Sequence, residues 1–285
     1  MKVGTACFLS DKTAFPSEVA IAVEDRGLDG IFFPEHSHIP VSRETQYPEL
    51  YGGGELPDFY KSMFDPFVAC AAAMSVTTRI NIGTAISLLA LRDTVLTAKE
   101  VASIDLLSGG RFMFGVGFGW NRDEYVTHRV DFATRHRKVA DQVAALKKLW
   151  TSDVAEHDGE FVTVPPSWAW PKPAQAPHPP ILLGGNGPRT MRAAAQYADG
   201  WMPTLRAEDP AMKVAMSQFA EVLAARDRRI EDTTVIASGI FESSDQLKQL
   251  AENGIRYAIF FVPADDRSEM LRVMDTLAEA KAEVA

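Results

Sequence analysis

The sequence predicts an α/β protein whose eight strand–helix pairs close into a (β/α)8 TIM barrel, with insertions after strand 2 and before strand 5. Strand-like and helical segments alternate along the whole chain, which is typical of a parallel sheet. Several strands, such as residues 257–263 (YAIFFVP), are continuous apolar runs, as expected when helices cover both faces. The length of 285 residues suits one domain over residues 1–285. A doubly wound open sheet is the alternative, because periodicity does not show closure.

The first half of the chain contains four predicted strands, each followed by a helix. The first helix begins at Pro16, where a missing N–H costs nothing, and ends at Gly27. Asp65 is placed to cap the second helix, and the sequence SGGR closes the third. The predicted strands are residues 2–9, 30–36, 80–86 and 111–117, and the predicted helices are 16–27, 66–76, 94–107 and 133–150.

The second half repeats the same alternation. Its helices have apolar residues at helical spacing, and its strands are short and apolar. The predicted strands are residues 179–185, 200–204, 234–240 and 257–263, and the predicted helices are 189–198, 209–229, 243–254 and 268–284.

Two stretches are longer than a connection needs. Residues 37–64 leave the C-terminal end of a strand, the face where barrels hold their active sites, and carry aromatic residues, prolines and the glycines 52–54. We expect a lid there; a surface excursion without function is the alternative. Residues 151–179 leave a helix, and we expect this proline-rich segment to cover the barrel rather than gate it.

The charge, apolar content and cysteines of the chain limit the classes of partner that we expect. A net charge of −9 and a pI near 5.2 argue against nucleic acid or an anionic membrane, and no apolar stretch approaches the ~20 residues of a membrane span. The N-terminus is predicted to be a strand rather than a signal peptide. Cys7 and Cys70 form neither a CxxC motif nor a disulfide framework, which fits a reducing cytoplasm. We therefore expect a cytoplasmic protein that binds a small molecule.

A glycine-rich turn connects a predicted strand to a helix in residues 182–201. The glycines of LLGGNG allow a ligand to approach the backbone, and the helix begins at Pro188. The N–H groups of Arg189 and Thr190 then point from a helix N-terminus, which favours an anion such as a phosphate. A tight turn without a ligand is the alternative. The turn has no Walker lysine and is not GxGxxG.

Glu35 and His36 lie where the second strand meets its loop. A histidine positioned by an acid can transfer a proton near neutral pH, whereas the alternative is a structural polar pair. His36 and His38 also form an HxH pattern, which metal-dependent hydrolases of barrel fold use. The remaining histidines fall in predicted helix, loop or pre-strand positions, so we expect no metal site.

Gly115, Gly117 and Gly119 alternate at the end of the fourth strand. Such a strand end lets a flat ligand or another backbone come close, and a bulge or bend is the alternative.

Together these segments resemble the bacterial luciferase-like monooxygenase superfamily, and within it the actinobacterial oxidoreductases that use the deazaflavin coenzyme F420. The resemblance covers nearly the whole chain, in residues 29–36, 80–125, 145–153 and 179–201. It implies a (β/α)8 barrel with insertions and a flavin-type ring over the C-terminal mouth of the barrel.

The resemblance also implies where the cofactor lies. Its phosphate would be held by the turn, with Arg189 and Arg192 able to serve it, and a non-prolyl cis peptide between Ala85 and Ile86 would press against the ring. The cofactor-binding residues it indicates are Ala85, Ile86, Gly117, Gly119, Asp123, Gly185, Asn186, Gly187, Arg189 and Thr204.

One position departs from the family. The deazaflavin sugar dehydrogenases carry a glutamate directly after the strand-4 glycine motif, where this chain has Trp120, although Asp123 and Glu124 follow. The departure makes sugar-phosphate oxidation by the same acid doubtful. Tyr47, Tyr51 and Trp120 are the expected walls of the substrate pocket.

The function that the resemblance implies is hydride transfer between C5 of coenzyme F420 and an organic substrate, with His36 oriented by Glu35 as the catalytic pair. An FMN-dependent monooxygenase is the first alternative, because the net acidic chain gives no clear support for a groove that holds the acidic F420 tail. A non-catalytic flavin-binding protein is the second. Superfamily members are often dimers, so we expect a homodimer.

Overall fold

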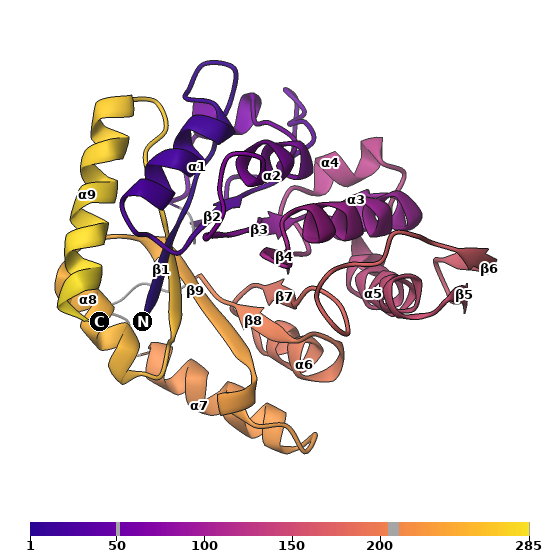
Figure 1. The fold of residues 1–285 in the computed structure, drawn as a ribbon. Coiled ribbons are helices and arrows are strands. Elements are labelled where there is room, and N and C mark those ends of the chain that lie inside the picture. The colour runs from indigo at the N-terminus through magenta and orange to yellow at the C-terminus, as the bar shows by residue number, and fades with distance from the viewer. Residues whose placement is uncertain (50–51, 205–210, 285) are drawn as a thin grey trace.

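A closed barrel of parallel strands forms the centre of the molecule (Figure 1). The computed structural model describes residues 1–49, 52–204 and 211–284. Around the barrel the strands follow the order β1-β10-β9-β8-β7-β4-β3-β2, and β2 pairs with β1 to complete the ring. The predicted (β/α)8 class is therefore confirmed, and the open-sheet alternative is wrong.

The barrel strands are short and the helices surround them. The strands are β1 (Lys2–Ala6), β2 (Gly30–Phe33), β3 (Asn81–Ser87), β4 (Phe112–Val116), β7 (Ile181–Gly184), β8 (Gly200–Met202), β9 (Thr234–Ile240) and β10 (Tyr257–Phe261). The α-helices are α1 (Pro16–Asp25), α2 (Pro66–Met74), α3 (Thr94–Leu107), α4 (Arg122–Thr127), α5 (Arg135–Thr151), α6 (Pro188–Tyr197), α7 (Ala211–Ala224), α8 (Ser244–Glu252) and α9 (Arg267–Glu283).

Two apolar layers stabilise this arrangement. The barrel interior is filled by side chains from alternate strand positions, among them Phe32, Met113, Leu182 and Ile259. The larger outer layer lies between the strands and the helices, and it includes the fully buried Trp201. Because both faces of each strand are covered, the continuous apolar runs in the sequence have a direct physical cause.

Most predicted elements are present, and the differences concern their ends. The strands expected over residues 2–9 and 30–36 stop at Ala6 and Phe33, because the backbone beyond them turns into loops over the barrel mouth. The short helix α4 was not predicted. Asp65 caps α2 as expected, since its side chain accepts hydrogen bonds from the N–H groups of Phe67 and Val68.

The two insertions have different structures. The segment after β2 contains one 3-10 helix, η2 (Asp58–Lys61). The segment before β7 contains an antiparallel hairpin of β5 (Val154–Asp158) and β6 (Thr163–Trp168), which lies at the periphery beyond α5 (Figure 1). His157 on this hairpin bonds to Asp141 of α5 over 2.7 Å. None of the helices in the described part of the chain has the length and apolar composition that membrane spanning requires.

Candidate active site

Residues predicted to be functional gather at one end of the barrel, where the carboxyl ends of its strands meet. His36 follows β2 and Ile86 lies within β3. Trp120 follows β4, Asn186 follows β7 and Thr204 follows β8. This end of the barrel is the candidate active site.

His36 forms a buried hydrogen bond with a carboxylate. Its Nδ1 donates to Oε2 of Glu124 over 2.7 Å, and the two side chains are 6% and 0% exposed. Because the carboxylate accepts, the proton sits on Nδ1 and the lone pair of Nε2 is left to accept another proton. Glu124 is on α4, whose backbone places it opposite the loop after β2. A buried histidine–carboxylate pair of this kind is suited to general acid–base chemistry.

Glu35 does not orient His36 as the sequence led us to expect. Its carboxylate instead accepts from Oγ of Ser87 (2.7 Å), from the N–H of Leu88 (2.6 Å) and from Nε of Arg92 (2.6 Å). These partners lie at the end of β3 and in the segment that follows it, whereas the partner of His36 lies on α4. Glu35 therefore fixes the end of β3, and Glu124 takes the role assigned to it.

Aromatic side chains surround the His36 ring. The ring centroids of Tyr60 and Trp120 lie 5.2 and 5.6 Å from that of His36. Tyr47 packs 5.7 Å from Trp120 and 5.4 Å from Tyr60. Tyr47 and Trp120 were predicted pocket walls, whereas Tyr60 was missed, although the aromatic content of the insertion was a signal for it. The predicted wall Tyr51 lies outside the described residues.

The indole N–H of Trp120 is buried and has no acceptor among the residues that the structure describes. A buried donor without a partner is costly, by about 1–3 kcal/mol. An acceptor on a bound molecule would remove this cost.

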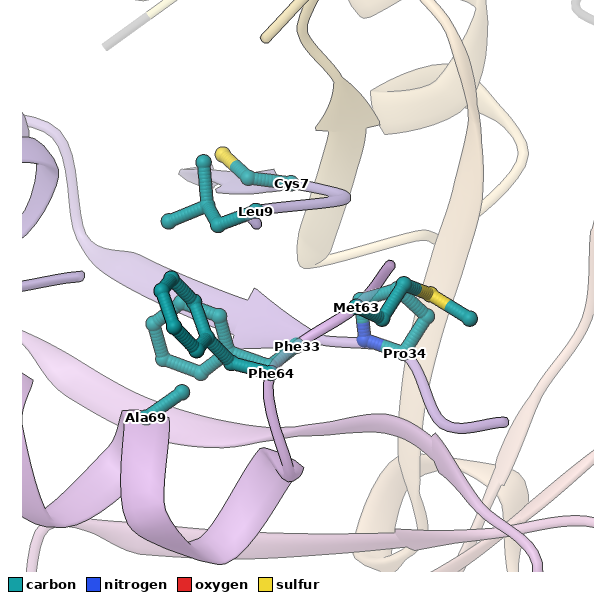
Figure 2. Close-up of a pocket in the computed structure, with 7 residues that line it drawn as sticks. All are labelled: Cys7, Leu9, Phe33, Pro34, Met63, Phe64 and Ala69. Carbon is teal, nitrogen blue, oxygen red and sulfur yellow. The ribbon is translucent and has the colours of Figure 1, made fainter. Parts of the chain in front are cut away.

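The first insertion is tied down over the site. Asp123, predicted to bind cofactor, instead accepts from the N–H groups of Glu44 (3.2 Å) and Thr45 (3.0 Å), and the bonds from Thr45 hold the pKa of Asp123 below its ordinary value. Farther along, the N–H of Phe64 donates to the carbonyl of Leu9 over 2.9 Å. Phe64 lies among apolar side chains (Figure 2), and the space between them is too small for a water molecule.

The predicted cis peptide between Ala85 and Ile86 is present, and the pairing of β3 with β4 shifts register there. A Cβ on Gly117 would lie 2.0 Å from Cδ1 of Ile86, and a Cβ on Gly184 would lie 2.7 Å from its Cγ2. These two glycines therefore make room for the Ile86 side chain at the barrel mouth.

Gly119 has a different reason to be glycine. Its φ is +62°, and an added Cβ would lie 3.1 Å from the ring of Tyr125. Gly117 and Gly119 thus make room for neighbouring side chains where the chain leaves β4. Contact of Gly117 with a flat ligand, which the sequence suggested, stays a prediction.

The glycine-rich turn after β7 is held by side-chain bonds. Gly185 has a φ of +125°, where glycine is favoured. Asn186 exchanges two hydrogen bonds with the backbone of Thr204, of 2.5 and 2.8 Å. The Thr204 hydroxyl lies 3.2 Å from that of Ser238. The predicted neighbours Asn186 and Thr204 are thus brought together across β7 and β8.

Helix α6 begins at Pro188 as predicted, with Gly187 as its N-cap. The N–H of Thr190 donates to the carbonyl of Gly187 over 2.9 Å, so it is not available to an anion. The N–H groups of Gly187 and Arg189 precede the first intrahelical bond and point out of the helix. An added Cβ on Gly187 would meet nothing within 4 Å, so the approach to these groups is open.

Arg189, expected from the sequence to bind the cofactor, lies close to Arg135 and His136, which sequence reasoning missed. Burial lowers the pKa of His136 to about 4, and the charges of Arg189 and Arg135 act in the same direction. The His136 ring stacks on Phe118 with a centroid distance of 4.0 Å. Because Arg135 and His136 begin α5 while Arg189 begins α6, the N-termini of two helices add to this positive field.

The HxH pattern does not assemble a metal site in the described residues. His36 pairs with Glu124, and Nδ1 of His38 lies 3.0 Å from Oγ of Ser37. Across residues 1–49, 52–204 and 211–284, no group of three or more His, Cys, Asp or Glu side chains is arranged to hold a metal ion.

Comparison with known sequences finds relatives over most of the chain. The family model for luciferase-like monooxygenases matches residues 12–283. An uncharacterised protein of Mycobacterium tuberculosis, Rv0953c, is 38% identical over 280 residues, covering 98% of each chain. The F420-dependent glucose-6-phosphate dehydrogenase of Gordonia bronchialis is 27% identical over 227 residues, covering 75% of this chain and 62% of that protein.

Solved structures share the fold at low sequence identity. The monooxygenase RslO1 from Streptomyces bottropensis superposes with a TM-score of 0.82 at 17% identity, covering all of both chains. An F420-dependent secondary alcohol dehydrogenase gives 0.78 at 16% identity, covering 100% of this chain and 99% of that one. A type II Baeyer–Villiger monooxygenase from Pseudomonas putida, in complex with FMN, gives a TM-score of 0.66 at 16% identity, covering 88% of this chain and 71% of that one.

The barrel, the bulge in β3 and the match over residues 12–283 agree with one another. The chain belongs to the luciferase-like monooxygenase family.

Proposed function

We propose that this protein is a coenzyme F420-dependent oxidoreductase that transfers a hydride between the deazaflavin and an organic substrate. The observation that carries the proposal is the buried His36–Glu124 pair at the mouth of the barrel. A relative that uses F420 and shares 27% of its residues with this chain supports the choice of cofactor.

The residues at the mouth fit a phosphate-bearing cofactor with a flat ring. The open N–H groups of Gly187 and Arg189 suit a phosphate, and Asn186 holds the turn in place. Ile86 stands where the ring would rest, with Ala85 preceding it in the bulge. When bound, the deazaflavin would supply a carbon that accepts or gives up a hydride.

The basic residues beside the turn support F420 over FMN. FMN ends in one phosphate, whereas F420 continues into a lactyl phosphate and an acidic glutamate tail. Arg135 and Arg189 lie at the N-termini of α5 and α6, next to the turn after β7. This group offers the positive exit that the overall charge of −9 does not reveal.

His36 is proposed as the base or acid for the substrate. Glu124 holds the ring with Nδ1 protonated, so Nε2 can accept the proton that an alcohol or similar group loses as its hydride departs. Trp120, Tyr47 and Tyr60 form an aromatic enclosure on this side of the mouth, which favours a substrate with apolar surface and excludes water.

Fluorescence titration of the apoprotein with F420 and with FMN tests the cofactor. We expect micromolar or tighter binding of F420 and at least tenfold weaker binding of FMN. Arg189→Ala should weaken F420 binding at least threefold and change FMN binding less. Lys148→Ala, at the other end of α5, is the matched control and should change neither. Tighter binding of FMN would overturn the proposal in favour of the monooxygenase, and oxygen uptake would then be the assay.

Substitution of His36 separates an enzyme from a non-catalytic flavin-binding protein. His36→Ala should lower kcat by about 10²- to 10⁴-fold on a substrate found by screening, with the cofactor Kd changed by less than about threefold. Glu124→Gln should lower kcat with a smaller loss. Equal turnover in wild type and His36→Ala would refute the role of His36.

We also propose a cytoplasmic homodimer. On the outer faces of α2 and α3, Val68, Leu96 and Leu107 are 65%, 65% and 72% exposed, an apolar surface that a second copy would cover. Both cysteines are free and buried, which is compatible with a reducing compartment.

A further inference from the structure

The His36–Glu124 pair does not end at Glu124. The second oxygen of that carboxylate, Oε1, accepts from the backbone N–H of Ser37 over 3.0 Å and from its hydroxyl over 3.3 Å. Ser37 is exposed, whereas Glu124 is fully buried. A chain of hydrogen bonds therefore runs from the barrel mouth through a buried carboxylate to a surface hydroxyl.

Two histidines contact that hydroxyl. Nε2 of His128 lies 2.8 Å from Oγ of Ser37, and Nδ1 of His38 lies 3.0 Å from it. His38 is also bound through Nε2 to the hydroxyl of Thr127 over 3.0 Å. Because a serine hydroxyl donates one hydrogen and accepts others, it can pass a proton between Glu124 and a histidine.

The two histidines differ in their position relative to a cavity, which His128 lines. Its volume is about 260 Å³, which is enough for several water molecules, and both Ser37 and His128 line it. Its wall also includes Glu35 and Arg92, so water there has polar partners. The cavity lies on the α3 side of the loop after β2. It connects the hydrogen-bond chain to water by a route other than the barrel mouth.

The protonation state of His128 suits this position. Burial lowers the pKa of His128 below 6.5; the charge of Glu124 opposes the shift and that of His38 reinforces it. His128 is therefore neutral at pH 7, and its Nε2 can accept a hydrogen from Ser37 and release a proton to water.

We propose that His36, Glu124, Ser37 and His128 form a proton relay between the active site and the cavity. The proposal rests on the proposed function only in that hydride transfer from an alcohol leaves one proton behind. A bound deazaflavin would accept the hydride with the electron pair of the C–H bond, and the O–H proton would go to Nε2 of His36. The relay then moves protons alone.

Each hop balances. The Nδ1 proton of His36 moves to the carboxylate of Glu124. The carboxyl group then turns to present this proton from the oxygen that faces Ser37, and the Ser37 hydroxyl turns its hydrogen from Glu124 toward His128. The carboxyl gives its proton to Oγ of Ser37 while the hydroxyl hydrogen moves to Nε2 of His128, which loses its Nδ1 proton to cavity water. Glu124 and Ser37 end unchanged, His36 and His128 end with their protons on Nε2, and one proton has left the site. Reduction of a carbonyl would use the same steps in reverse. His36 would thus exchange protons with water even when the aromatic enclosure is closed.

Proton exchange in the apoprotein tests the relay without cofactor or substrate. The Nδ1 proton of His36 is observed by NMR of protein labelled with ¹⁵N-histidine. In wild type we expect this resonance to be broadened by exchange with water. Ser37→Ala should slow exchange at least tenfold and sharpen the resonance, because the hydroxyl link is lost while the backbone N–H bond to Glu124 remains. His128→Gln should do the same.

His38→Gln is the matched control, since His38 binds the same hydroxyl but is absent from the described lining of the cavity. It should leave exchange as in wild type. Equal exchange rates in all four proteins, or slowing by His38→Gln as strong as by His128→Gln, would overturn the relay. Since the measurement needs no cofactor, its failure would leave the F420 titration untouched, and failure of that titration would leave the relay standing.

Discussion

The contact between Gly117 and Ile86 yields a prediction whose size follows from the structure. In Gly117→Ala the new Cβ would lie 2.0 Å from Cδ1 and 2.8 Å from Cγ1 of Ile86, whereas ordinary contact begins at 3.4 Å. The tip of Ile86 must therefore move by about 1.4 Å, against neighbours that include Gly184. Overpacking of this kind costs about 1–3 kcal/mol. We expect the free energy of unfolding to fall by that amount.

The same geometry predicts a rescue. Ile86→Ala removes both crowded atoms and leaves Cβ, which lies 3.4 Å from the new methyl group. Gly117→Ala should then cost less than about 0.5 kcal/mol when Ile86 is already alanine. Urea unfolding of wild type, both single variants and the double variant, followed by circular dichroism, measures the coupling directly. We expect a coupling of at least about 0.5 kcal/mol.

Gly187→Ala is the matched control, because a Cβ there meets nothing within 4 Å and the φ of −82° suits alanine. It should cost no more than about 1 kcal/mol, the preference of an N-cap for glycine over alanine, and this cost should not depend on Ile86. The reasoning would be refuted if Gly117→Ala lowered stability equally with and without Ile86, since the clash would then not be the cause.

Three further predictions follow from burial and exposure. The pKa of His136 is about 4 in the native state against 6.5 ordinarily, so the unfolded state binds a proton that the native state does not, and stability should fall as pH drops from 6.5 to 4. In His136→Gln the urea midpoint of unfolding should depend less on pH between 6.5 and 4. A pH dependence equal to that of wild type would contradict the prediction. Burial raises the pKa of Cys7 to about 12 and that of Cys70 well above its usual range, so iodoacetamide at pH 8 should label neither thiol until urea is added. Leu107→Glu should convert the proposed dimer to a monomer, as measured by light scattering. Val214→Glu, on the surface of α7, is the control and should leave the dimer intact. If the dimer persists in both variants, its interface does not lie on α2 and α3.

The sequence alone determined the alternation of parallel strands and helices and the glycine turn after β7, whereas closure of the sheet into a barrel came from the structure. Alternating apolar strands and helices specify the parallel sheet, because each periodic segment can bury its apolar face in only one way. The turn after β7 could also be predicted from the sequence, because the glycines and the proline that form it act on the backbone within a few residues. The cis peptide at Ala85–Ile86 followed from the resemblance of a contiguous segment to a known family.

Only the tertiary structure decided which acid serves His36. Glu35 is its neighbour in sequence, but its carboxylate is bonded to Ser87, Leu88 and Arg92 instead. Glu124 lies 88 residues away and reaches His36 because β2 and β4 are brought to the same mouth with α4 above them. Sequence periodicity contains no information on that distance.

The basic group beside the turn was hidden for a related reason. Net charge sums over the whole chain and reports an acidic protein, whereas Arg135 and Arg189 are brought together only when α5 and α6 pack side by side. The local pattern of apolar residues predicts which face of each helix or strand is buried. The positions at which those elements end, and therefore which side chains meet there, are set by closure of the barrel.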